Sequence, residues 1–170
     1  MSPRFLLIPF ILQGLVMAAD ELWYHRRREV PRLERLGHPV DTMGMLACLL
    51  WLFQGPPTNQ SVLVYTGLAI LSTLLITKDE FMHARHCRPG EHWLHAVLFI
   101  LHPVVLLCAG LLWPALYPTS GANGFANILY SGAETMFLRG QTCLIFLFGI
   151  YQLIFWNLIW RHPRNPPPFR

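Results

Sequence analysis

Residues 77–102 read TKDEFMHARHCRPGEHWLHAVLFILH, and this stretch decides the fold because it closes one apolar segment and opens the next. Between the two segments it gathers carboxylates and imidazoles in a short turn: Asp79, Glu80, His83, His86, Glu91, His92 and His95. Polar groups at that density beside hydrocarbon are costly unless something compensates their charge. A bound metal cation, or a pair of them, is the simplest compensation. The stretch therefore predicts a metal site where two helices meet.

The rest of the chain is apolar enough to be a membrane protein. Of its 170 residues, 54% are hydrophobic and 13% are charged, which is unusual for a soluble domain. A helix needs about 17–25 mostly apolar residues to cross a bilayer. Five segments reach that length once their polar flanks are included: Phe5–Ala19, Val40–Phe53, Ser61–Thr77, Trp93–Trp113 and Thr142–Trp160. The sequence therefore predicts an all-α polytopic membrane bundle of about five transmembrane helices, four of which form a bundle with a metal site at its cytoplasmic end.

A weak internal repeat suggests how this domain is organised. One set of segments begins at Asp20 and reads DELWYH, RRR and GHP. A similar set begins at Asp79 and reads DEFMH, AR and GEH. Chance similarity is the alternative explanation. We expect a single transmembrane domain over residues 1–160 and a disordered, proline-rich tail over 161–170. Within the domain, helical hairpins over 1–54 and 60–113 would be followed by a helix over 141–160.

Proline and glycine predict where the segments begin and end. The second segment should open at His38–Pro39, because proline is tolerated in the first helical turn. The third should continue as a helix beyond Thr77 until Pro89 stops it. Residues 114–140 are expected to form a loop with a short interfacial helix over 125–130. The last segment, which is almost uncharged, should be a supporting helix.

Arginine and lysine predict the orientation. They cluster in the first connector, the third connector and the tail: Arg26, Arg27, Arg28, Arg32 and Arg35, then Lys78, Arg85 and Arg88, then Arg161, Arg164 and Arg170. Five crossings with the N-terminus outside and the C-terminus in the cytoplasm place all three clusters in the cytoplasm, in a membrane such as the bacterial inner membrane. The net charge of +4 then reflects topology and lipid headgroups rather than nucleic acid. A signal peptide cleaved before Asp20 is the alternative, but it would leave the triple arginine outside.

Several acidic and sulfur-containing residues have other expected roles. Glu29 and Glu34 lie among the connector arginines, and we interpret them as headgroup and topology contacts. Glu134 is expected to be solvated. The cysteines within apolar segments, which are Cys48, Cys108 and Cys143, should behave as small hydrophobes, whereas Cys87 is a minor candidate ligand. Their spacing does not predict a disulfide framework.

Helical spacing selects the candidate ligands at the polar helix ends. Glu21 and His25 are four residues apart, as are Glu91 and His95, so each pair is expected to share a helix face. The predicted metal ligands are Glu21, His25, His38, Asp41, Asp79, Glu80, His83, His86, Glu91, His92 and His95. Residues expected to lie behind the ligands or against a substrate are Asp20, Tyr24, Trp93 and His102, with Trp23 also lining the approach.

Mixed imidazole and carboxylate ligands suit iron, zinc or manganese, and this many candidates exceed the needs of one tetrahedral zinc. Over Asp20–Asp41 and Asp79–His102 the cluster resembles the integral-membrane di-iron proteins of the fatty-acid hydroxylase and desaturase group, which also gather histidines at cytoplasmic helix ends. Their HxxHH boxes are absent here. The Glu80–His83 pair, at i and i+3, equally resembles the soluble ferritin-like carboxylate class. The resemblance implies two iron ions.

The expected function is a membrane oxidoreductase that uses a di-iron centre and O2 to hydroxylate or desaturate a lipid-like substrate at the cytoplasmic face. Its expected partners are membrane lipids, the substrate and an electron donor, and not nucleic acid. A zinc-dependent hydrolase of a lipid amide or ester is one alternative. A non-enzymatic protein that binds metal, or haem through His25, His95 or His102, is the other. No catalytic residue besides the ligands is assigned.

Overall fold

A computed structural model describes residues 3–27, 30–78, 80, 89–117 and 132–160. Every regular element in this part of the chain is helical, which confirms the all-α prediction. The five long helices are α1 (Ile8–Ala19), α2 (Arg32–Leu52), α3 (Asn59–Ile76), α5 (Pro89–Leu112) and α7 (Gly132–Ile154). Helical turns extend both ends of α1, over Pro3–Leu7 and Asp20–Tyr24 to His25–Arg27, and the ends of α5 and α7, over Trp113–Leu116 and Phe155–Ile159.

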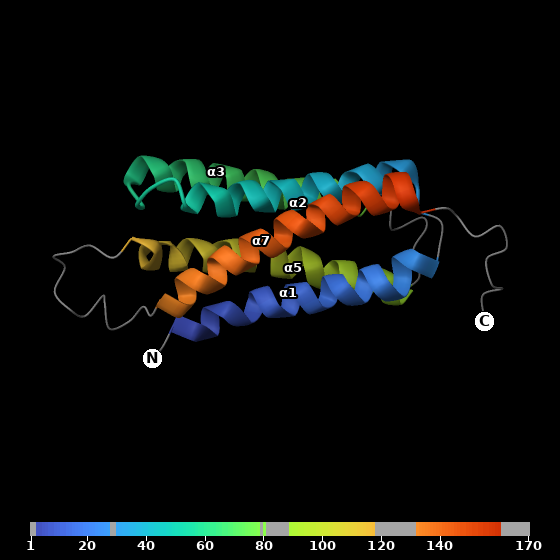
Figure 1. Cartoon of the computed structure of the whole chain (residues 1–170), viewed down its shortest axis with the longest axis horizontal. Coiled ribbons are helices and arrows are strands. Elements are labelled where there is room, and N and C mark those ends of the chain that lie inside the picture. Colours follow the sequence, from blue (N-terminus) through green and yellow to red (C-terminus); the bar gives the residue numbers. More distant parts are fainter. Residues whose placement is uncertain (1–2, 28–29, 79, 81–88, 118–131, 161–170) are drawn as a thin grey trace.

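The helices lie along one axis and alternate in direction (Figure 1). Helix α2 packs against α3 and α7, whereas α5 packs against α1 and α3. One end of the bundle, on the right of Figure 1, therefore holds the end of α1, the starts of α2 and α5, and the end of α7. We call it the site end. The sequence predicts that polar helix ends converge there, and the topology agrees.

Among the described residues, four helices are long and apolar enough to cross a membrane: Arg4–Tyr24, Asn59–Ile76, Pro89–Leu116 and Gly132–Ile159. The helix outside this group is α2, whose first turns carry Arg32, Glu34, Arg35 and Asp41. These turns lie at the site end, so α2 is less apolar than the other helices because of the charged residues that it carries there. The outward faces are apolar, with Leu63 and Ile100 exposed, as expected for helices surrounded by lipid.

An apolar core fills the half of the bundle away from the site end. Leu49 and Leu52 of α2, Leu106 and Leu112 of α5, and Leu138 of α7 are all completely or almost completely buried there. Cys48 and Cys108 belong to the same core, as predicted for small hydrophobes. The core fixes the helices at one end, and the polar residues meet at the other.

Two helices begin earlier than the sequence predicts. Helix α2 starts at Arg32, directly after Pro31, so Pro39 lies inside the helix rather than in its first turn. Helix α7 starts at Gly132, so the loop expected over 114–140 is partly helix. The expected short helix over 125–130, the continuation of α3 over 81–88 and the tail over 161–170 lie outside the described residues.

Candidate metal centre

His25 is the centre of a buried cluster at the site end. Its Nε2 atom lies 3.2 Å from Oε1 of Glu34 and 3.0 Å from Nε2 of His38. The Glu34 and His38 atoms are 3.5 Å apart, since the two residues are one turn apart on α2. The side chains of His25 and Glu34 are 2% exposed, and that of His38 is 17% exposed. The end of α1 and the start of α2 thus bring three potential ligand atoms together.

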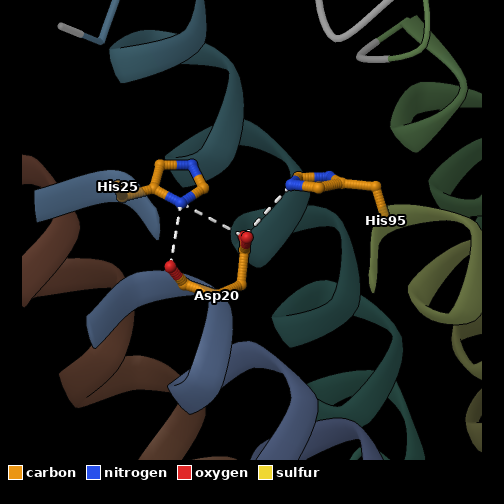
Figure 2. A group of neighbouring side chains, drawn as sticks. All are labelled: Asp20, His25 and His95. Atoms are coloured by element: carbon orange, nitrogen blue, oxygen red, sulfur yellow. Dashed lines mark hydrogen bonds and ion pairs between the residues drawn. The ribbon is translucent and has the colours of Figure 1, made fainter. Parts of the chain in front are cut away.

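The other ring nitrogen of His25 faces Asp20. Nδ1 lies 3.2 Å from Oδ2 of Asp20 and 3.3 Å from its backbone oxygen. The same Oδ2 lies 3.1 Å from Nε2 of His95, which α5 brings to the opposite side of the carboxylate (Figure 2). His25 therefore connects two groups of potential ligands, one with Asp20 and His95 and one with Glu34 and His38.

The pairing of Asp20 with His25 depends on a π-helical turn over Asp20–Tyr24. In this turn the backbone N–H of His25 donates to the carbonyl oxygen of Asp20, five residues earlier. In an α-helix, residues five apart point about 140° away from each other, because each residue turns about 100°. The wider π turn brings them to the same side. Helical spacing predicts that His25 pairs with Glu21, whereas the structure pairs it with Asp20.

Glu21 is instead held by α7. Its Oε1 accepts hydrogen bonds from the hydroxyl of Tyr151 at 2.6 Å and from Nε1 of Trp156 at 2.9 Å. Arg26 adds a contact to the same tyrosine hydroxyl and lies over the ring of Phe155. The predicted supporting helix therefore anchors the end of α1 and sets the position of the turn that carries His25.

The electrostatics of the cluster favour a positive charge at its centre. Two buried carboxylates, from Asp20 and Glu34, face the two ring nitrogens of His25. Burial lowers the pKa of His25, but the hydrogen bonds and charges of these two carboxylates outweigh burial and raise the pKa to about 10. In addition, Oδ1 of Asp20 is buried and has no hydrogen-bond partner among the described residues. A proton or a metal cation would satisfy this arrangement.

The distances around Nε2 of His25 fit a metal ion. A metal with bonds of about 2.0–2.1 Å places its ligand atoms about 3.0 Å apart in an octahedron and about 3.3 Å apart in a tetrahedron. The three separations among His25, Glu34 and His38 are 3.2, 3.0 and 3.5 Å. Two histidines and one carboxylate are the ligand set of several zinc hydrolases and of non-haem iron oxygenases. Asp20, on Nδ1 of His25, would orient the ring from behind.

The starts of α2 and α5 match each other in a register that differs from the repeat predicted above, which aligns GHP with GEH. Glu34 and His38 are the third and seventh residues of α2, and Glu91 and His95 are the third and seventh residues of α5. Both pairs are offset by 57 residues, from 34 to 91 and from 38 to 95. Glu91 is 1% exposed, so both glutamates are buried at matching positions. The starts of α2 and α5 therefore each present a Glu–His pair at the site end, with Glu34, Glu91 and His95 buried and His38 partly buried.

An apolar cavity of about 320 Å³ begins at the cluster and extends into the bundle. Asp20, His25, His38 and His95 line its polar end, whereas Met45 of α2 and Ile145 of α7 lie deeper. His102 also lines it, and its Nε2 lies 2.9 Å from the hydroxyl of Ser72. The walls come mainly from α1, α2, α5 and α7, so α7 is part of the site-bearing bundle and not only a support.

Three predicted ligands lie apart from the cluster, and each is part of an ion pair. Both oxygens of Asp41 are 2.6 Å from Nζ of Lys78, so this predicted ligand forms an ion pair between α2 and the end of α3. Nε2 of His92 lies 3.0 Å from Oε1 of Glu80, and both side chains are almost half exposed. Neither pair belongs to the groups of close ligand atoms among the described residues.

The remaining predicted site residues have varied positions. Asp79, His83 and His86 lie outside the described residues. Trp23 and Trp93 are exposed and do not line the main cavity. The hydroxyl of Tyr24 packs so closely on Gly90 that a Cβ there would approach it within 2.6 Å. A larger residue at position 90 would therefore require the Tyr24 side chain, which lies between the end of α1 and the start of α5, to shift.

The sequence analysis missed several residues of the site. Glu34, interpreted as a headgroup contact, is buried beside His25, and its four-residue spacing from His38, matching Glu91 and His95, was a usable signal. Glu134, expected to be solvated, is buried too, but it lies in the first turn of α7, at the opposite end of the bundle from the site. Tyr151 and Trp156 had no distinguishing signal, because aromatic residues near the end of an apolar segment also fit a membrane interface.

Comparison with known proteins does not add an identity to this geometry. No protein family, curated protein or solved structure matches the chain.

Proposed function

We propose that this protein is an integral-membrane oxidoreductase with a two-metal centre, most simply of iron, that uses O2 to hydroxylate or desaturate a lipid-like substrate. The observation that carries the proposal is the position of His25, which joins two groups of potential ligands beside an apolar cavity. A ligand that fits this apolar cavity is mostly hydrocarbon, and its C–H bonds can be oxidised but not hydrolysed.

The ligand sets divide naturally between the two sides of His25. Glu34 and His38 face Nε2 of His25, and the Asp20 carboxylate with His95 lies on the Nδ1 side. Glu91, buried at the position in α5 that Glu34 occupies in α2, is a further candidate for the second side. Iron, when bound, would supply the activation of O2, and the protein would orient the ligands and limit access of water.

The reaction needs an external electron donor. Hydroxylation converts R–H, O2, two electrons and two protons into R–OH and water. Desaturation removes two hydrogens from neighbouring carbons and, with the same O2, electrons and protons, forms two waters. A redox protein or a reduced quinone would be the donor. The arginines and Lys78 at the site end support a cytoplasmic position for this end, in the orientation with the N-terminus outside.

A zinc-dependent hydrolase is the second candidate, and one observation favours it. His25, Glu34 and His38 by themselves make the two-histidine, one-glutamate set of zinc hydrolases, with separations close to tetrahedral values. In that case one zinc ion would suffice, and Asp20 and His95 would only orient His25 and the substrate. The two candidates differ in metal, in stoichiometry and in the requirement for O2.

Elemental analysis and an optical spectrum of gently purified protein test the proposal. We expect about two irons per chain and no Soret band, followed by O2 consumption with a chemical reductant and membrane lipids. Glu34→Gln should reduce bound metal by more than about tenfold. Glu80→Gln is the matched control, because Glu80 lies outside the cluster. One zinc per chain and O2-independent activity would replace the oxidoreductase by the hydrolase. A Soret band, or no metal, would contradict both.

A further inference from the structure

The cavity below the cluster is lined from α1 and α7 by residues that are also exposed, which indicates a lateral opening between these two helices. These helices touch near one end through the rings of Phe10 and Phe137, whose centroids are 5.5 Å apart. At the site end they touch again, where Tyr151 and Trp156 bind Glu21. Between these two contacts, α1 packs mainly on α5 and α7 mainly on α2. Figure 1 shows that α1 and α7 diverge from one end toward the other.

The residues at this opening are exposed on the outside of the bundle. Gly14 and Ala18 of α1 and Leu144 of α7 all line the cavity and are also exposed. They lie within the helices that are long and apolar enough to cross a membrane. In a bilayer the opening would therefore face lipid chains and not water.

The cavity surface changes from polar to apolar with depth. At the site end it presents the carboxylate and imidazoles of the cluster. Of the deeper polar groups, His102 pairs with Ser72 at 2.9 Å and Thr42 with Gln152 at 2.7 Å, and the amides of Gln13 and Gln141 also line the cavity. The rest of the surface is apolar and comes mainly from Met17, Met45, Leu98, Leu144, Ile145 and Phe148.

The dimensions fit one chain. From His95 to His102 is seven residues of α5, which is about 10 Å along the helix. A volume of about 320 Å³ has room for an alkyl chain of medium length.

We propose that the cavity binds one alkyl chain of a membrane amphiphile, which enters from the bilayer between α1 and α7 and lies with its polar end at the His25 cluster and its methyl end toward His102. The inference rests on the proposed function for what happens to the chain, but binding itself does not need a metal. With this orientation, the C–H bonds nearest the cluster belong to the polar end of the chain.

Photocrosslinking in vesicles tests this proposal. The probes are two diazirine analogues of dodecanoic acid, with the reactive group near the methyl end or near the carboxyl end, and the labelled residues are identified by mass spectrometry. The methyl-end probe should label Met45 and Ile145, and the carboxyl-end probe should label Met17 and residues nearer the cluster. A reversed pattern would overturn the orientation. Labelling confined to outward residues such as Leu63 and Ile100 would overturn the site.

Gly14→Leu is the variant that should close the opening. A Cβ at Gly14 meets no atom within 4 Å, so a larger side chain fits without disturbing the helix. It should reduce labelling of the cavity by more than tenfold. Gly67→Leu is the matched control, because Gly67 is equally unobstructed on α3 but does not line the cavity. Equal labelling in both variants would contradict lateral entry, and Ala18→Phe repeats the test at a second position.

Metal content measured on the same samples separates this inference from the proposed function. Gly14→Leu should retain the wild-type metal content while losing chain binding. If wild-type protein contains no metal but still shows ordered labelling of the cavity, the proposed function fails and the chain site remains. If metal is present and labelling is random, the chain site fails and the metal centre remains.

Discussion

Two carboxylate–imidazole groups at the same end of the bundle have very different surroundings. His25 and Glu34 lie 3.2 Å apart with both side chains 2% exposed, whereas His92 and Glu80 lie 3.0 Å apart with 41% and 47% of their side chains exposed. Water screens the exposed pair, which should contribute about 0–1 kcal/mol. The buried group cannot use water and needs its charges balanced inside the protein. The two groups have the same residue types at nearly the same distance. Burial is what makes the His25 group, and not the His92 group, a candidate metal centre.

Replacing the central histidine is the strongest test of this difference. His25→Ala removes the residue shared by both ligand groups, so metal affinity should fall by more than about 100-fold. It also leaves Asp20 and Glu34 buried without their shared partner, which should destabilise the metal-free protein by about 3–5 kcal/mol. His92→Ala should change neither property appreciably. Metal titration and thermal unfolding in detergent measure both effects, and equal metal loss in the two variants would move the centre toward Glu80 and His92.

A smaller effect is expected from the residue behind His25. Asp20→Asn keeps the shape of the side chain but weakens the contacts to Nδ1 of His25 and to Nε2 of His95. In a one-metal centre, where Asp20 only orients His25, metal affinity should decrease by about 10–100-fold, whereas in the two-metal centre the metal on the Nδ1 side should be lost. Competition with a chelator measures the change. Retained wild-type affinity would mean that the Nδ1 side of His25 does not support the centre.

The smallest effect concerns the anchor from α7. Trp156→Phe removes one hydrogen bond to the buried carboxylate of Glu21 while leaving the one from Tyr151. The expected cost is about 1.5–3 kcal/mol, since the acceptor is charged. Thermal unfolding measures it, with Trp93→Phe as the control because Trp93 is exposed. A similar loss in both variants would show that ring size, and not the hydrogen bond, is what matters.

The sequence predicted the helices and the convergence of polar ends well, because apolar length and periodicity are properties of each segment alone. It also selected His25, His38 and His95, which the structure brings within one buried region. It failed for Glu34, since neighbouring arginines suggested a lipid-facing position that burial contradicts. It failed for Tyr151 and Trp156 for a different reason. Which face of an apolar helix turns inward depends on packing with distant segments, and the sequence of one segment does not contain that information.

The π-helical turn at Asp20–Tyr24 has a consequence for how the length of the chain can change. A π turn contains one residue more than an α-helical turn, so it accommodates the extra residue while the helix on either side keeps its direction. Deleting one residue of the turn would restore an α-helix in which the residues now numbered Asp20 and His25 are four apart and still share a face. A second π turn, over Phe155–Ile159, carries Trp156 on the opposite side of the same contact. In evolutionary terms, a codon can be gained or lost at such a turn while the helix beyond it and the packing of the bundle stay in place.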